Sequence, residues 1–134
     1  MLNTEELKKG LQQCTGTTQY FRHSLSRLQY TEGIQYLAKN AECYWLIDAI
    51  ASYQHQLIKK ESLQEFQLWL LVVGNDHEFI KPASHQDAVL TCWEDTPKAG
   101  DKPVVRQNIP FTDFPLPEMK LYVQELILML PDEN

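Results

Sequence analysis

Arg22 and His23 form an adjacent pair of side chains that could do chemistry together. An imidazole titrates near neutral pH and can act as a general base, while a guanidinium can hold an anionic group. Aromatic residues precede the pair, and Tyr20 is expected to contribute to binding beside Arg22. The competing interpretation is structural: His23 satisfies a backbone group and Arg22 pairs with a carboxylate.

Asp48 is the second candidate, because it lies within the most apolar predicted helix. Burying a carboxylate without a partner is costly, so we expect Asp48 to be buried and paired with Arg22 or His23. Such a pair is either a structural ion pair or a catalytic element. Ser52 lies one turn further along and would complete a Ser–His–Asp arrangement, although the chain lacks a nucleophile-elbow motif. Tyr53 on the same helix is a further candidate binding residue.

Asp113 is the third candidate and lies between two aromatic residues in Phe111-Thr112-Asp113-Phe114. An Asp that follows Thr in a loop typically caps backbone N–H groups, which is the structural interpretation. In the functional interpretation, Asp113 is a second carboxylate beside Asp48, and the two would act as an acid–base pair or hold a metal. The spacing does not require this.

No motif indicates a metal or a cofactor. The acid and histidine residues at 76–77 and 85–87 fall in predicted turns and lack the HxH or HxxxH spacing of ligands. The three cysteines, Cys14, Cys43 and Cys92, are far apart and form no CxxC motif. They are predicted to be small buried thiols in a reducing compartment.

Length and charge exclude several classes of protein. The 134 residues suit one domain, 1–134, and 43% are hydrophobic. The net charge of −6 repels phosphate backbones, so no nucleic-acid partner is expected. The longest apolar runs, 68–73 and 126–130, are too short to span a bilayer, and the N-terminal residues lack the apolar stretch of a signal peptide. The predicted location is the cytoplasm, with no membrane association.

The elements that must position these residues begin with helices. Asn3 is a predicted N-cap of a helix ending near Cys14, and Thr31 is the predicted N-cap of a second helix. A third helix is predicted over 41–59, with an apolar stripe of Leu46, Ile50, Tyr53 and Leu57.

Strands follow at 66–73, 78–81, 88–93 and 104–109, with a polar loop at 97–103. Residues 118–130 form either a hairpin turning near Gln124-Glu125 or a helix that starts at Pro117, and the alternation favours the hairpin. This order predicts an α+β fold, with N-terminal helices packed on a C-terminal antiparallel sheet of about five to six strands.

Several phrases resemble an uncharacterised family of small bacterial proteins, of the domain-of-unknown-function kind. Over most of the chain the phrases are Thr15-Gly16-Thr17, Tyr20-Phe21-Arg22-His23, Tyr30-Thr31-Glu32-Gly33, Tyr44-Trp45-Leu46-Ile47-Asp48, Ala51-Ser52-Tyr53-Gln54 and Phe111-Thr112-Asp113-Phe114-Pro115. The resemblance implies a hairpin in the tail, where such relatives often have a glycine in the turn. It implies no activity, substrate or catalytic residue.

Two functional hypotheses follow. The first is a non-enzymatic interaction or regulatory module, with a protein partner or a second copy of the chain. The alternative is a small enzyme or sensor acting on an anionic or nucleotide-like small molecule, and it requires four side chains to converge on one cleft. These are Arg22, His23, Asp48 and Asp113. The sequence does not decide whether the protein is an enzyme.

Overall fold

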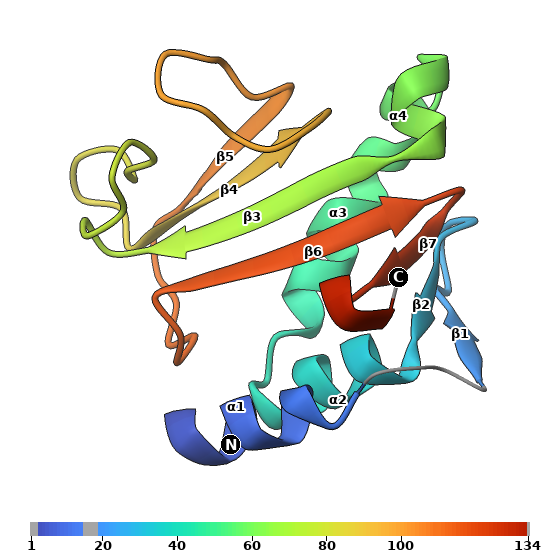
Figure 1. Ribbon diagram of the computed structural model, residues 1–134, viewed down its shortest axis with the longest axis horizontal. Coiled ribbons are helices and arrows are strands. Elements are labelled where there is room, and N and C mark those ends of the chain that lie inside the picture. The colour runs from blue at the N-terminus through green and yellow to red at the C-terminus, as the bar shows by residue number, and fades with distance from the viewer. Residues whose placement is uncertain (1–2, 15–18, 134) are drawn as a thin grey trace.

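The computed structural model describes residues 3–14 and 19–133. One mixed, mostly antiparallel sheet of seven strands crosses the molecule in the order β1-β2-β7-β6-β3-β4-β5 (Figure 1). The strands are β1 (Tyr20–Arg22), β2 (Gln29–Thr31), β3 (Gln67–Val73), β4 (Ala88–Trp93), β5 (Val105–Ile109), β6 (Glu118–Gln124) and β7 (Ile127–Met129). The α+β prediction is confirmed.

The sheet differs from the prediction in two respects. Within the residues that the structure describes it has seven strands instead of five or six, and two of them, β1 and β2, come from the N-terminal third of the chain. It is also not wholly antiparallel, because β2 pairs parallel with β7 through Tyr30 and Leu128. The C-terminal tail is therefore inserted between the N-terminal hairpin and the rest of the sheet.

Four α-helices and one 3₁₀ helix occur in the described residues: α1 (Thr4–Gln12), α2 (Glu32–Asn40), α3 (Tyr44–Leu57), α4 (Glu61–Glu65) and η1 (Pro131–Glu133). Both predicted N-caps are confirmed. Asn3 Oδ1 accepts the Glu6 N–H at 2.8 Å, and Thr31 Oγ1 accepts the Ile34 N–H at 3.3 Å. Each side chain satisfies a backbone donor that the first turn of a helix leaves without a partner.

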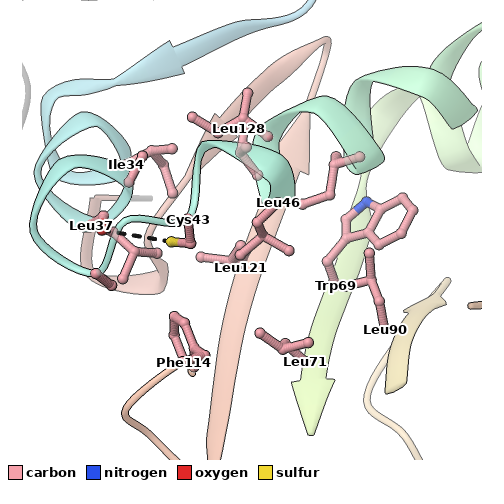
Figure 2. Packing of buried hydrophobic residues seen from close by; sticks show 14 of the residues in the cluster. Ile34, Leu37, Cys43, Leu46, Trp69, Leu71, Leu90, Phe114, Leu121 and Leu128 are labelled. Atoms are coloured by element: carbon pink, nitrogen blue, oxygen red, sulfur yellow. Dashed lines mark hydrogen bonds between the residues drawn. The ribbon is translucent and has the colours of Figure 1, made fainter. Parts of the chain in front are cut away.

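The main core lies between the helices and one face of the sheet. Figure 2 shows residues of α2 and α3 packed against alternate residues of the strands. Labelled there are Ile34, Leu37, Cys43, Leu46, Trp69, Leu71, Leu90, Phe114, Leu121 and Leu128. The other face of β3 and β4 packs a smaller cluster that includes Leu70 and Ile80. Because both faces of β3 are covered, its sequence is an almost continuous apolar run, as predicted.

The loop that covers the second face was predicted to contain a strand at 78–81, and this prediction is wrong. His77 Nδ1 accepts the backbone N–H groups of Phe79 at 3.3 Å and Ile80 at 3.0 Å, which winds the segment into a turn. Lys81 then contributes its carbonyl to Arg106 Nη2 at 2.6 Å, which ties the turn to β5. The predicted loop at 97–103 is confirmed as irregular.

The tail forms the predicted hairpin, with β6 and β7 paired through Val123 and Leu128. Its turn lies one residue later than predicted, at Glu125 and Leu126, whose φ angles are 49° and 65°. Two successive positive φ angles are the pattern of a type I′ turn, which normally takes Asn-Gly. A leucine in this region of φ is strained, because its Cβ crowds the backbone.

A polar network is buried where α3 meets β3. Gln54 and Gln67, both almost wholly buried, exchange reciprocal amide hydrogen bonds of 2.8 and 2.9 Å. The Gln67 amide also donates to the Leu63 carbonyl at 2.9 Å and accepts from Trp69 Nε1 at 2.8 Å. Every polar atom of Gln67 is thus satisfied, and this residue fixes the register of β3 against α3 and α4.

The C-terminal residues are held against the start of α2. Glu133 Oε1 accepts from Thr31 Oγ1 at 2.6 Å and from the Leu130 N–H at 3.0 Å, while Oε2 accepts from the Gly33 N–H at 3.2 Å. A carboxylate at this position also interacts favourably with the positive end of the α2 dipole. The packing is close, since a Cβ on Gly33 would lie 2.5 Å from Glu133 Oε1.

Cys43 and Cys92 are buried free thiols, and burial raises the pKa of each from its ordinary value of 9.0 to about 12. Because the folded pKa values are raised, their stabilising contribution is complete below pH 9 and is lost as the pH rises towards 12. We expect the free energy of unfolding at pH 10.5 to be lower than at pH 8 by about 2 kcal/mol per thiol.

Urea unfolding at the two pH values measures this loss, and the Cys43→Ala/Cys92→Ala variant is the control. The variant should lose markedly less stability between pH 8 and 10.5 than wild type, because its unfolded chain has lost two ionising thiols. An identical pH dependence in both proteins would contradict the prediction.

Candidate functional site

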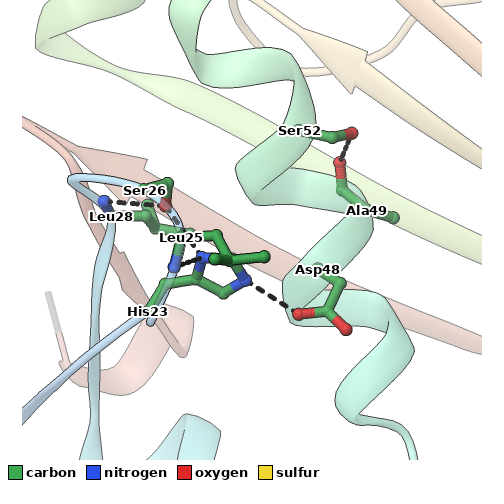
Figure 3. Close-up of polar contacts among 7 residues, drawn as sticks. All are labelled: His23, Leu25, Ser26, Leu28, Asp48, Ala49 and Ser52. Atoms are coloured by element: carbon green, nitrogen blue, oxygen red, sulfur yellow. Dashed lines mark hydrogen bonds and ion pairs between the residues drawn. The ribbon is translucent and has the colours of Figure 1, made fainter.

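The loop at 23–28, which joins β1 to β2, is organised by the ring of His23. The His23 N–H donates to the Leu28 carbonyl at 2.9 Å, which closes the loop. The Leu25 N–H donates to His23 Nδ1 at 3.2 Å, and Ser26 Oγ lies 3.0 Å from the same nitrogen (Figure 3). Ser26 Oγ in turn accepts the Leu28 N–H at 3.2 Å. The imidazole thus acts as a turn-forming acceptor within its own loop.

The other ring nitrogen connects the loop to α3. His23 Nε2 lies 2.8 Å from Asp48 Oδ1 (Figure 3). Because the Leu25 N–H can only donate, Nδ1 must be the acceptor, and in the neutral ring the proton is then on Nε2, directed at the carboxylate. Ser26 Oγ, which accepts from Leu28, is free to donate to Nδ1. The donor directions are consistent from Leu28 through to Asp48.

The predicted pairing of His23 with Asp48 is therefore confirmed, but the predicted burial of Asp48 is wrong. The side chain of Asp48 is 71% exposed, whereas that of His23 is 12% exposed. Asp48 lies two residues from Leu46 and two from Ile50, which is just over half a helical turn in each direction. It consequently projects from α3 opposite the apolar stripe, and His23 approaches it from outside the core.

Ser52 is not part of a triad. Its hydroxyl donates to the Ala49 carbonyl at 2.6 Å, one turn back on α3 (Figure 3). The lone pair of His23 is at Nδ1, where it is occupied by the Leu25 and Ser26 donors. A general base needs a free lone pair facing its substrate, and His23 presents none.

His77 provides a second example of the same arrangement. Its Nδ1 accepts two backbone N–H groups of its own turn, and its Nε2 lies 3.6 Å from Glu118 Oε2. In both loops a histidine closes a turn through Nδ1 and directs Nε2 at a carboxylate of a neighbouring element. This recurrence supports a structural role for the imidazole of His23.

The other sequence candidates form no hydrogen bond or ion pair with His23 or Asp48 among the described residues. Arg22 is exposed on β1 and Tyr20 is 53% exposed on the same strand. The Tyr53 hydroxyl donates to Gln107 Oε1 at 2.8 Å, towards β5. Asp113 is exposed, and its charge contributes to the raised pKa of Cys43, which places it near the start of α3. Of the four side chains expected in one cleft, His23 and Asp48 are the two that contact each other in the described residues.

A cavity of about 760 Å³ opens between the 23–28 loop and α3. Its walls come from the loop, from the outward face of α3 and from the β6–β7 turn. They are formed by His23, Ser24, Leu25, Ser26, Arg27, Asp48, Ala51, Ser52, Gln54, His55, Ile58 and Leu126. The strained Leu126 is held here because its carbonyl accepts the Gln29 N–H at 2.9 Å.

Most of these cavity residues were not identified from the sequence. Asp48, Ser52, His55 and Ile58 recur at helical spacing, so that wall could have been recognised as one face of α3. Leu25 is 90% exposed at the tip of the loop, and Leu126 belongs to a turn without glycine. Neither residue carries a local signal, because only the β2–β7 pairing brings the loop and the turn together.

Other kinds of site receive no support from the part of the chain that the structure describes. Within residues 3–14 and 19–133, no three His, Cys, Asp or Glu side chains are grouped so that they could hold a metal ion. In those same residues no helix has both the length and the apolar character needed to cross a membrane.

The comparisons with known proteins assign no function to this site. Neither the curated proteins nor the solved structures contain a match to the chain. One family model does match, described as a family of unknown function (DUF6876), and it covers residues 5–134. The phrase Thr15-Gly16-Thr17 lies outside the described residues. Since the match spans nearly the whole sequence, the chain belongs to this family of unknown function.

Proposed function

We propose that this protein is a non-catalytic module that binds a small organic molecule in the cavity between the 23–28 loop and α3. The observation that carries the proposal is the cavity itself. Its volume of about 760 Å³ is within the range of small-molecule sites, which is roughly 300–1,000 Å³. Its walls combine apolar side chains, such as Leu25, Ile58 and Leu126, with a few polar groups, which is the usual composition of such sites.

The hydrogen bonding of His23 favours binding over catalysis. Both ring nitrogens are engaged, one by the loop and one by Asp48, so the imidazole shapes the cavity wall and holds it against α3. A ligand would then meet a wall that is already ordered, which reduces the entropy lost on binding. The enzyme hypothesis required His23 as a base with Asp113 nearby, and the geometry does not favour it.

Ser52→Phe is expected to block the cavity, since Ser52 lies on its α3 wall and is exposed, so that a larger side chain does not disturb the core. The probe is the neutral fluorophore N-phenyl-1-naphthylamine, titrated by its fluorescence increase. Wild type should bind one equivalent, and Ser52→Phe should bind at least about tenfold more weakly, because apolar contact area is lost.

The matched control is Gln56→Phe, which adds the same ring to an exposed position of α3 that does not line the cavity. This variant should bind the fluorophore as wild type does. If wild type shows no saturable binding, or if both variants bind equally, the cavity is not a ligand site and the proposal is overturned.

A further inference from the structure

We infer that the ligand of this cavity is an organic cation, a molecule with an ammonium head group on an apolar body, and that Asp48 receives the head group. This inference rests on the proposed function, since it names the class of molecule that the same cavity takes. Its first support is the state of the Asp48 carboxylate. Oδ1 accepts from His23, while Oδ2 has no hydrogen-bond partner in the described residues.

The contact with His23 holds the Asp48 carboxylate in one orientation, ready to accept a further hydrogen bond. An exposed aspartate normally samples several rotamers, but here one oxygen is fixed at 2.8 Å from an imidazole that its own loop holds. The second oxygen is therefore held in place at the cavity wall. An ammonium that donates to Oδ2 would form a charge-assisted hydrogen bond and would lose little further side-chain entropy.

Arg27 is the cationic side chain that competes with this assignment, because it also lines the cavity. It is exposed on the loop, and no residue of the described chain accepts a hydrogen bond from its guanidinium. Ordering that long side chain around an anion would cost much of its rotamer entropy. The net charge of −6 also attracts cations and repels anions at long range. The fixed acid therefore outweighs the base, which has no hydrogen-bond partner among the described residues.

The cavity also offers apolar side chains at a distance from Asp48 along α3. Asp48, Ser52, His55 and Ile58 follow one face of α3, and ten helical residues span about 15 Å at a rise of about 1.5 Å per residue. The acid is at the start of this line and Ile58 is at its end. The β6–β7 turn lies by α4, where the Glu125 N–H donates to the Gln64 carbonyl at 3.1 Å, and it places Leu126 towards the Ile58 end. A linear molecule with its head group at Asp48 could therefore extend its apolar body towards Ile58 and Leu126.

The test uses three probes with one tail and different heads: n-octylammonium, 1-octanol and octanoate, each displacing N-phenyl-1-naphthylamine at pH 7. We expect octylammonium to bind most tightly. Asp48→Asn should weaken octylammonium about tenfold and leave 1-octanol unchanged, because one charge pair is worth about 1.4 kcal/mol in such a partly exposed site. The asparagine carbonyl can still accept from His23, so the loop stays tethered.

Asp101→Asn is the charge-matched control, since Asp101 is exposed in the 97–103 loop and does not line the cavity. It should leave all three affinities as in wild type. If octanoate binds as well as octylammonium, or if Asp48→Asn changes nothing, the cation assignment is overturned while the cavity remains a binding site. If neither the fluorophore nor any octyl compound binds, the proposed function itself fails.

Discussion

Gln67→Leu is expected to lower the free energy of unfolding by about 3–5 kcal/mol. The substitution removes the centre of the buried network and leaves three groups without partners. These are the Gln54 side-chain carbonyl, the Leu63 carbonyl and the Trp69 indole N–H, whereas the Gln54 amide nitrogen keeps its bond to the Ile50 carbonyl. Each orphaned polar group costs roughly 1–3 kcal/mol in a buried site, and leucine restores none of these hydrogen bonds. Urea unfolding at pH 7 measures the loss.

The control is Gln56→Leu, the same change at an exposed position of α3, which should alter stability by less than about 0.5 kcal/mol. The double variant Gln54→Leu/Gln67→Leu should lose less than the sum of the two single variants, because it removes both partners of the reciprocal bonds. A Gln67→Leu protein within 1 kcal/mol of wild type would show that the network contributes little to stability.

Glu133→Ala is expected to cost about 2–3 kcal/mol of unfolding free energy. Its carboxylate accepts three hydrogen bonds, from Thr31, Gly33 and Leu130, at the start of α2. Removing it leaves the backbone N–H groups of Gly33 and Leu130 without their hydrogen-bond acceptor in a half-buried site. It also removes a favourable negative charge at a helix N-terminus. Urea unfolding again provides the measurement.

Asp132→Ala is the matched control, because Asp132 is the exposed acid beside it. It should change stability by less than about 0.5 kcal/mol. Gly33→Ala should reproduce much of the Glu133→Ala loss, since its Cβ would displace the carboxylate and the Leu130 side chain. Equal stability of the Glu133→Ala and Asp132→Ala variants would show that the hydrogen bonds of the Glu133 carboxylate do not stabilise the fold.

Local chemistry made part of this fold predictable. The caps Asn3 and Thr31 act through hydrogen bonds to residues three positions away, so their sequence signals are self-contained. β3 and β4 were predictable for a related reason. They are apolar along their length because the sheet around them is covered on both faces.

The strands β1 and β2 could not be predicted in the same way. Each has three residues, and most of these are exposed or half-buried, so neither shows an alternating pattern. β2 exists because the tail returns to pair with it at Leu128. Residues 78–81 show the opposite error, since an apolar pair suggested a strand while the backbone donors were taken by His77.

The candidate site also combines features that could be predicted from the sequence with features that depend on distant segments of the chain. The pairing of His23 with Asp48 was predictable, because two complementary polar groups were expected to meet. Its position outside the core was misjudged, although the spacing of Asp48 from Leu46 and Ile50 already placed it on the outer face of α3. The cavity itself depends on the β6–β7 turn, and its strained leucine replaces the glycine that normally announces such a turn.

The insertion of β7 between β2 and β6 has a consequence for the order of folding. Within the described residues, β2 pairs with β1 on one side and with β7 on the other, and the β2–β7 pair joins Tyr30 to Leu128, which are far apart in the sequence. Such long-range pairs form slowly, and until this one forms, the edge of β2 that β7 covers leaves its backbone groups open to pairing with other chains. The cavity needs Leu126, whose carbonyl bonds to Gln29, so it is complete only once these distant segments have met.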